Sequence, residues 1–134
     1  MKKIEQVRIF EISTIKDFRG DLSFIENNSF LPFSFKRIFY ISGVPKNAER
    51  GGHAHKQLKE FIVCLNGSFD LHLDDGANKK IFSLNNSTSG LYIPSMVWRD
   101  MKNFSEGCIC IVIASELYDE EDYYRDYNKF LKAL

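Results

Sequence analysis

The sequence predicts an all-β protein, an antiparallel sandwich or barrel that ends in a short C-terminal helix. Short apolar and aromatic stretches recur along the chain, and turn signals rich in Gly, Asn and Asp separate them at regular spacing. From Asp119 onward the apolar residues recur at intervals of three and four, which is the period of an α-helix. The length of 134 residues fits a single domain covering residues 1–134.

Three strands are expected in the first third of the chain, at residues 7–12, 22–26 and 35–42. The string DFRGD at residues 17–21 predicts a turn between the first two strands. Residues 43–52 contain Pro45 and three glycines, so a loop is expected to follow the third strand.

Further strands are expected after this loop, because apolar runs of four to eight residues alternate with turn signals. The turn signals are centred on Gly67, Gly76, Asn86 and Gly107. The predicted strands are residues 60–65, 68–73, 80–84, 90–93, 97–101 and 108–115.

The C-terminal helix is predicted to begin after Asp119, whose side chain suits a helix N-cap. Acidic residues at 120–122 then lie at the positive end of the helix dipole. An apolar and aromatic stripe follows, and we interpret it as the face that packs on the sheet. It consists of Tyr123, Tyr127, Phe130, Leu131 and Leu134.

Composition excludes several classes of protein. The 18 basic and 18 acidic residues cancel, which argues against nucleic-acid and membrane-surface partners. A hydrophobic content of 44% excludes intrinsic disorder. The longest apolar run, residues 108–114, is far shorter than the roughly 20 residues that cross a bilayer. The basic N-terminus lacks the apolar stretch of a signal peptide, and the three cysteines show no metal-ligand spacing, so we expect a cytoplasmic protein.

The chemistry concentrates in the string RGGHAHK at residues 50–56. His53 and His55 are two residues apart, so on a strand they point from the same face. With Glu60 and Gly67 the spacing becomes H-x-H, four residues, E, six residues, G. This spacing matches the first motif of the cupin barrels, in which the two histidines and the glutamate normally bind a metal. Asn47 occupies the place of the motif's upstream glycine.

The second cupin motif argues against a metal. In residues 90–99, Met96 stands where a glycine is usual and Arg99 stands where the last histidine ligand is usual. A guanidinium has no lone pair for a metal and repels cations. A catalytic metal usually needs three or more protein ligands. We therefore predict neither a metal nor another cofactor, and expect the histidines to act as acid and base.

Several strings resemble the sugar 3,4-ketoisomerases of the cupin superfamily, which act on dTDP-4-keto-6-deoxy-D-glucose. The resemblance implies a homodimeric cupin jelly-roll β-barrel, often with exchanged N-terminal strands, that works without a metal. It also implies a role in making 3-amino-3,6-dideoxyhexoses for bacterial surface glycans. The strings are DFRGDLSFIENN (17–28), PFSFKRIFYI (32–41), RGGHAHKQLKEFIVCLNGSFDLHLDDG (50–76), GLYIPSMVWRDM (90–101) and ASELYDEEDYYRDYNKF (114–130).

Carried over residue by residue, the resemblance places the catalytic pair on His53 and His55 and an active-site tyrosine on Tyr40. It also marks two arginines, Arg19 of the D-x-R-G string and Arg50, which leads the histidine motif. Many relatives carry an amide at the position of Glu60. A carboxylate there can orient a histidine or raise its pKa, and it restores a trio that resembles metal ligands.

The reaction explains these residue types. Moving the ketone from C4 to C3 requires removal of the C3 proton, formation of an enediolate and protonation at C4. Histidine titrates near neutrality, so one imidazole can both accept and donate a proton. We expect His55 to act on carbon, His53 to move protons between oxygens and Tyr40 to bind the oxyanion. The sequence leaves these three roles interchangeable.

The nucleotide needs cations for its diphosphate, and the candidates are Arg19, Arg50, Lys56 and Arg99. Arg99 is a poor proton donor, so protonation from the histidine side is expected to give the gluco (quinovose) product over the galacto (fucose) product. Two other function classes stay open: a metal-dependent cupin enzyme, and a non-catalytic sugar-nucleotide-binding cupin. His72 is expected to point outward, and Phe61, Tyr92 and Trp98 to lie in the core.

Overall fold

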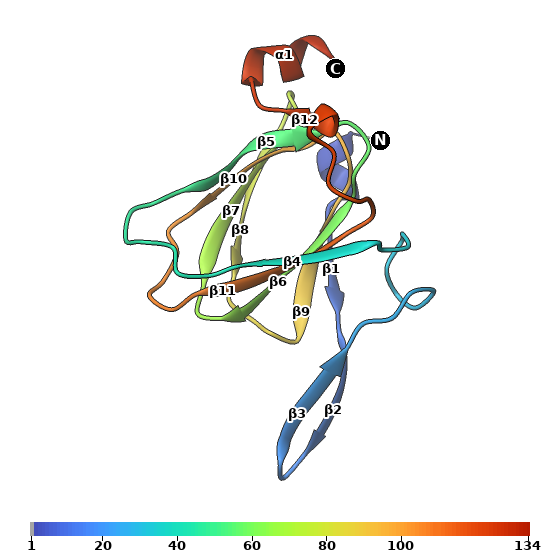
Figure 1. The fold of residues 1–134 in the computed structure, drawn as a ribbon, viewed down its shortest axis with the longest axis vertical. Coiled ribbons are helices and arrows are strands. Elements are labelled where there is room, and N and C mark those ends of the chain that lie inside the picture. The colour runs from blue at the N-terminus through green and yellow to red at the C-terminus, as the bar shows by residue number, and fades with distance from the viewer. Residues whose placement is uncertain (1) are drawn as a thin grey trace.

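The computed structural model describes residues 2–134, which form a jelly roll of two facing antiparallel sheets (Figure 1). In spatial order, the first sheet contains β1 (Arg8–Glu11), β9 (Ser89–Ile93), β6 (Glu60–Asn66), β11 (Ile109–Ala114) and β4 (Arg37–Ile41). The second contains β12 (Tyr123–Tyr124), β5 (Arg50–His55), β10 (Trp98–Lys102), β7 (Phe69–Asp74) and β8 (Lys79–Leu84). The predicted all-β class with a short C-terminal helix is confirmed.

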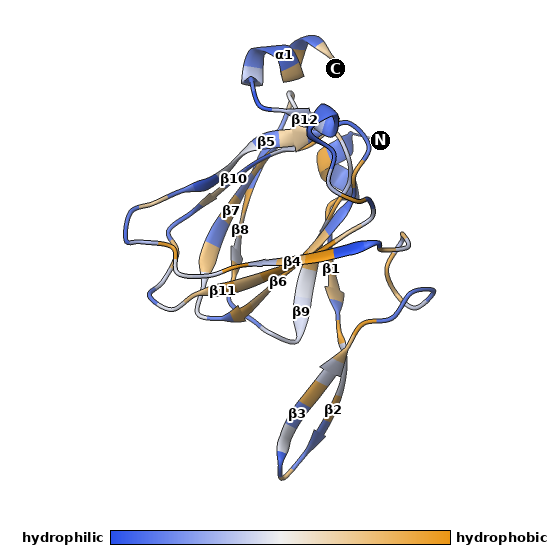
Figure 2. Ribbon diagram, in the orientation of Figure 1, coloured by the Kyte–Doolittle hydropathy of each residue, from blue (hydrophilic) through white to orange (hydrophobic). Residues whose placement is uncertain are grey.

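The core lies between the two sheets. On β7, Phe69, Leu71 and Leu73 are buried and alternate with the half-buried Asp70 and His72. Since strand side chains alternate between faces, this pattern turns the apolar face of β7 inward and His72 outward, as predicted. Figure 2 shows hydrophobic residues along the barrel strands of both sheets.

The aromatic residues assigned to the core are buried as expected. Phe61 and Tyr92 belong to a second apolar cluster with Ile12 and Leu31, on the first sheet. Trp98 packs with Phe130 of the C-terminal helix in a third cluster. These aromatic side chains therefore stabilise the barrel and lie outside the cavity described below.

The N-terminal region contains a hairpin that the sequence predicted only in part. β2 (Ser13–Asp17) and β3 (Gly20–Phe24) pair with each other and project from the end of the molecule opposite the C-terminal helix (Figure 1). The predicted turn at 17–21 lies at the hairpin's tip. β2 was missed because Ile15 is its only strongly apolar residue. A short 3₁₀ helix, η1 (Lys3–Gln6), precedes β1.

The predicted loop at 43–52 ends earlier than expected, because β5 already begins at Arg50. Gly51 and Gly52 have φ angles of 90° and 70°, and the register with β10 shifts between Arg99 and Asp100. A Cβ at Gly51 would lie 2.8 Å from the carbonyl oxygen of Arg99. The two glycines thus form an irregular strand start, like a β-bulge, in which Gly51 leaves no room for a side chain.

The C-terminal helix also differs from the prediction. Residues after Asp119 form a 3₁₀ turn, η2 (Glu120–Asp122), then β12, and only then α1 (Tyr127–Lys132). Asp119 caps η2, whereas Asp126 caps α1 through the backbone nitrogen of Lys129. The apolar residues from Tyr123 onward keep a helical spacing, but the pairing of β12 with β5 holds Tyr123 and Tyr124 in a strand. Within residues 2–134, no helix is long and apolar enough to cross a membrane.

Candidate active site

A cavity of about 260 Å³ lies between the two sheets, bordered by the C-terminal segment. β4, β5, β6 and β10 supply most of its polar wall, and β12 and the following residue close one side. The polar side chains on this wall are Tyr40, Arg50, His53, His55, Glu60, Arg99, Tyr123 and Arg125.

His53 and His55 face this cavity from β5, as their spacing predicted. Their ring centroids are 4.9 Å apart, and the ring of Tyr123 lies 5.0 Å from His53 and 4.4 Å from His55. His55 is fully buried and His53 is half-buried. Tyr40 reaches the same cavity from β4 with its side chain largely exposed.

The environment keeps both histidines neutral at pH 7. Burial, followed by the nearby Arg99 guanidinium, lowers the pKa of His53 to about 4 and that of His55 to about 2. The Nδ1 of His55 lies 3.0 Å from Oδ2 of Asp122, and this carboxylate favours the charged ring and so opposes the shift. A neutral imidazole keeps one nitrogen lone pair available to take up a proton.

Arg99 forms a buried ion pair with Glu60 and also donates to the carbonyl oxygen of Val97. The pKa of Arg99 falls to about 10 through burial, so the guanidinium stays charged at neutral pH. Glu60 Oε1 is 3.9 Å from Nε2 of His55. The Glu60 carboxylate, the third member of the metal-like trio, is paired with the Arg99 guanidinium, which carries a positive charge and no lone pair for a metal. His53, His55 and Glu60 therefore do not fit a metal ion.

The structure brings together six of the eight predicted site residues. Arg50 lines the cavity alongside the histidines, Tyr40, Glu60 and Arg99. Lys56 does not: its side chain is exposed and lies over the ring of Tyr124, outside the cavity. Arg19 does not either, because it lies at the tip of the β2–β3 hairpin and pairs with Asp17.

Sequence reasoning missed three residues of the C-terminal segment: Asp122, Tyr123 and Arg125. Tyr123 and Arg125 line the cavity, and the Arg125 guanidinium lies 4.2 Å from the ring centre of Tyr123. Asp122 bonds His55. The signal was present in the acidic and aromatic run at residues 118–124, but we interpreted its helical spacing as the packing face of a helix.

Two departures from the cupin motifs have a conformational explanation. Asn47 and Met96 stand where the motifs carry glycine, and both have positive φ angles, of 68° and 61°. The backbone therefore keeps the left-handed conformation that glycine usually supplies there. Asparagine adopts it readily, whereas methionine does so rarely. The turns that precede β5 and β10 are thus preserved without glycine.

A family model described as FdtA: WxcM-like, C-terminal, matches residues 5–134. The chain belongs to this family. It is 43% identical over 127 residues to the TDP-4-oxo-6-deoxy-alpha-D-glucose-3,4-oxoisomerase of Aneurinibacillus thermoaerophilus, covering 95% of this chain and 91% of the relative. That relative's name confirms the predicted family of sugar 3,4-ketoisomerases.

Solved structures of WxcM-like proteins have the same fold. A variant of the 3,4-ketoisomerase QdtA from Thermoanaerobacterium thermosaccharolyticum, in complex with TDP-4-keto-6-deoxyglucose, superposes with a TM-score of 0.92 at 42% identity. The match covers 95% of this chain and 92% of that one. The TDP-quinovose 3,4-ketoisomerase WlaRB from Campylobacter jejuni gives 0.91 at 42% identity, over 96% and 98% of the two chains. The cupin-like barrel predicted from the motifs is confirmed.

Proposed function

We propose that residues 1–134 form one domain, a 3,4-ketoisomerase that converts dTDP-4-keto-6-deoxy-D-glucose to the 3-keto sugar. The observation that carries this proposal is the pair of neutral histidines that face one cavity from β5. Family membership supports the substrate, because the relatives are named for the same sugar nucleotide. The product would serve the synthesis of 3-amino-3,6-dideoxyhexoses in the cytoplasm.

In the proposed reaction, Nε2 of His55 takes the proton from C3, which the neighbouring C4 carbonyl acidifies. The C3–H electron pair forms the C3–C4 double bond, and O4 gains negative charge as an enediolate. Arg99 and the Tyr40 hydroxyl line the cavity and stabilise this oxyanion. The positive charge that develops on His55 lies near the carboxylates of Asp122 and Glu60.

Collapse of the enediolate moves the carbonyl to C3 and delivers a proton to C4. His53 transfers the hydroxyl proton from O3 to O4. Its ring adjoins that of His55, so it lies close to a sugar whose C3 is in contact with His55. Arg99 keeps its proton and donates none to carbon. Protonation at C4 therefore comes from the histidine side and gives the gluco product.

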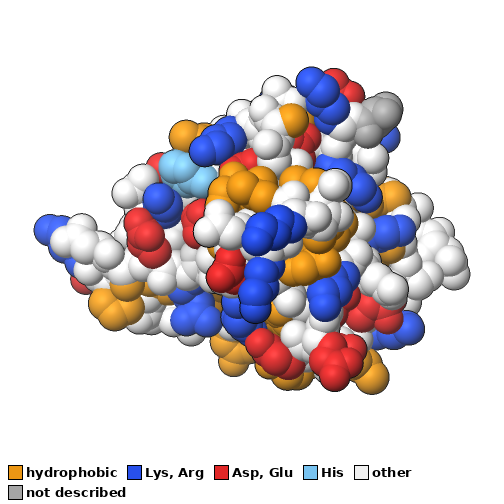
Figure 3. All heavy atoms as spheres, turned by 90° about the horizontal axis from the view of Figure 1, so that it is seen from above, with side chains coloured by type: hydrophobic (Ala, Val, Ile, Leu, Met, Phe, Trp, Pro, Cys, Tyr) orange, Lys and Arg blue, Asp and Glu red, His pale blue; other side chains and the backbone are white. Residues whose placement is uncertain are grey.

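The nucleotide would lie at the mouth of the cavity. Arg50 and Arg125 are the exposed cations on the cavity wall and suit a diphosphate. Seen from the end that carries α1, the surface shows Lys and Arg side chains beside hydrophobic ones (Figure 3).

We further propose a homodimer in which the β2–β3 hairpin docks on a second copy. Ile15, Phe18 and Leu22 of the hairpin are 59%, 97% and 60% exposed, and an isolated two-stranded hairpin is marginally stable in water. Docking would bury these side chains and bring Arg19 to the partner's cavity. Light scattering should give twice the chain mass for the wild type and the mass of one chain for Phe18→Ser. The mass of one chain for the wild type would reject the dimer.

The proposed activity is tested by incubating the purified, chelator-treated protein with dTDP-4-keto-6-deoxy-D-glucose and following the sugar by NMR. We expect the 3-keto product without added metal, with coupling constants at C4 of the gluco configuration. A galacto pattern would overturn only the role given to Arg99 and would leave the isomerase assignment standing. Activity lost to the chelator and restored by one divalent ion would favour the metal-dependent alternative, and nucleotide binding without turnover would favour the binding-module alternative.

A further inference from the structure

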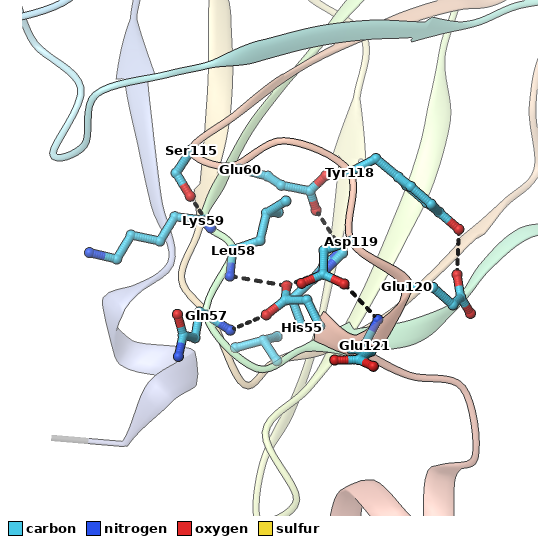
Figure 4. Close-up of polar contacts among 12 residues, drawn as sticks. His55, Gln57, Leu58, Lys59, Glu60, Ser115, Tyr118, Asp119, Glu120 and Glu121 are labelled. Carbon is cyan, nitrogen blue, oxygen red and sulfur yellow. Dashed lines mark hydrogen bonds and ion pairs between the residues drawn. The ribbon is translucent and has the colours of Figure 1, made fainter.

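The Asp122 carboxylate is held in place by donors from β5 and the turn after it. Figure 4 labels the residues that supply these donors, His55, Gln57 and Leu58. Oδ1 accepts from the backbone nitrogen of Gln57 at 2.9 Å. Oδ2 accepts from the backbone nitrogen of Leu58 at 3.3 Å and faces Nδ1 of His55 at 3.0 Å. The side chain is only 15% exposed, so water competes little for these bonds. This arrangement requires a short side chain with two acceptor oxygens.

The backbone around Asp122 is tied to the same strand. The carbonyl oxygen of Asp122 accepts from the nitrogen of Lys56 at 2.8 Å, and Tyr123 pairs directly with His55. Asp122 thus has little freedom to move relative to the imidazole. A fixed carboxylate beside a ring nitrogen determines which nitrogen carries the proton.

The direction of the bond follows from the donors. Backbone N–H groups already donate to both Asp122 oxygens, and a carboxylate can only accept. The third bond must then be donated by Nδ1–H of His55. In a neutral ring this leaves the lone pair on Nε2, the nitrogen on the Glu60 side of the cavity. His53 differs, because its buried Nδ1 has no hydrogen-bond partner among the described residues.

We propose that Asp122 is a positioning residue that holds His55 in the Nδ1–H tautomer and so presents Nε2 to the substrate as the base. The catalytic part rests on the proposed ketoisomerase function, whereas the tautomer does not. The C-terminal segment departs from a helix here because β12 pairs with β5, and this pairing places Asp122 beside His55. Asp122 touches no substrate in this scheme and acts only through His55.

The tautomer can be measured without substrate. ¹⁵N NMR of histidine-labelled protein should show the His55 ring with a protonated Nδ1 and an unprotonated Nε2 at pH 7. In Asp122→Asn, the amide oxygen can still accept from the backbone, but its NH₂ group then faces Nδ1. The ring should therefore switch to the Nε2–H form. A wild-type spectrum with the proton on Nε2 overturns the proposal, even if the variant does not fold.

Turnover supplies the second readout. The same exchange in a serine-protease triad lowers kcat by about 10⁴, so we expect Asp122→Asn to lose at least 10²-fold in kcat with little change in dTDP affinity. Asp119→Asn is the matched control, since Asp119 caps η2 in the same segment and the structure gives it no bond to His55. Equal kcat and tautomer in Asp122→Asn and the wild type would contradict the assignment. A wild type with the expected tautomer but no isomerase activity would reject the proposed function and leave the tautomer assignment standing.

Discussion

The barrel strands and the C-terminal segment both line the cavity but differ in character. β5 and β10 contribute buried groups, His55 and Arg99, whose pKa values are displaced by desolvation. The C-terminal segment contributes Arg125, which is half exposed and pairs with the equally exposed Glu120. Groups that carry out chemistry are thus fixed in the sheets, and groups at the entrance remain accessible to solvent. Four predictions test this division.

The largest effect is expected at His55. His55→Asn keeps a polar side chain of similar shape but cannot take a proton from carbon, so turnover should fall about 10²–10⁴-fold. Binding of dTDP, measured by calorimetry, should change little. His53→Asn should be impaired less, because it moves protons only between oxygens. Near wild-type turnover in His55→Asn would remove this residue from the mechanism.

The buried ion pair between Arg99 and Glu60 predicts a difference in the free energy of unfolding between variants of buried and of exposed cavity residues. Arg99→Met leaves the Glu60 carboxylate buried without its partner, which costs about 3–5 kcal/mol in the free energy of unfolding. Urea denaturation measures this loss, and adding Glu60→Gln should recover part of it. Arg50→Met is the control on the same cavity wall, and its exposed side chain should affect stability by less than about 1 kcal/mol. Equal losses for both arginines would contradict the buried character given to Arg99.

The lowered histidine pKa values make stability depend on pH. Between pH 6.5 and 4, the unfolded chain binds a proton at His53 that the folded chain does not, so stability falls as the pH decreases through this window. At pH 5 this amounts to about 2 kcal/mol relative to neutral pH. His53→Asn should therefore lose less stability than the wild type between pH 7 and pH 5 in urea denaturation. The matched control is His72→Asn, outside the cavity; a wild-type pH dependence in His53→Asn would show that His53 is not held neutral.

The smallest effect is expected at the entrance. Arg125→Met should weaken dTDP binding roughly tenfold, the value of one charge-assisted hydrogen bond at a solvated site, and leave the free energy of unfolding almost unchanged. Lys56→Met offers a comparison, because Lys56 lies outside the cavity over Tyr124. Calorimetry that found the larger loss in Lys56→Met would place the nucleotide on the other side of β12.

The sequence predicted the site residues on the barrel strands better than those in the C-terminal segment. His53 and His55 alternate with Gly52 and Ala54, so their common face follows directly from the period of a strand. Arg99 was located by its place in the second motif. Asp122 was not identified, because Tyr123, Tyr127 and Phe130 keep a helical spacing that local patterns cannot distinguish from an interrupted one. Its partner His55 is 67 residues away, and only tertiary contacts show that η2 and β12 replace the first turns of the expected helix.

Arg19 illustrates a second limit. The family resemblance assigned it to substrate binding, yet it lies at the tip of a projecting hairpin, away from the cavity of its own chain. The exposed apolar side chains of the hairpin are the physical reason for proposing that this arginine serves a second copy.

The central claim is that histidine-mediated proton transfer moves the ketone through an enediolate. Reaction of the metal-free protein with dTDP-4-keto-6-deoxy-D-glucose in deuterated water tests it most directly. We predict deuterium at C4 of the 3-keto product, because a histidine whose proton exchanges with solvent delivers it. A 3-keto product with no label at C4 would indicate direct internal transfer of hydrogen from C3 and would contradict the account.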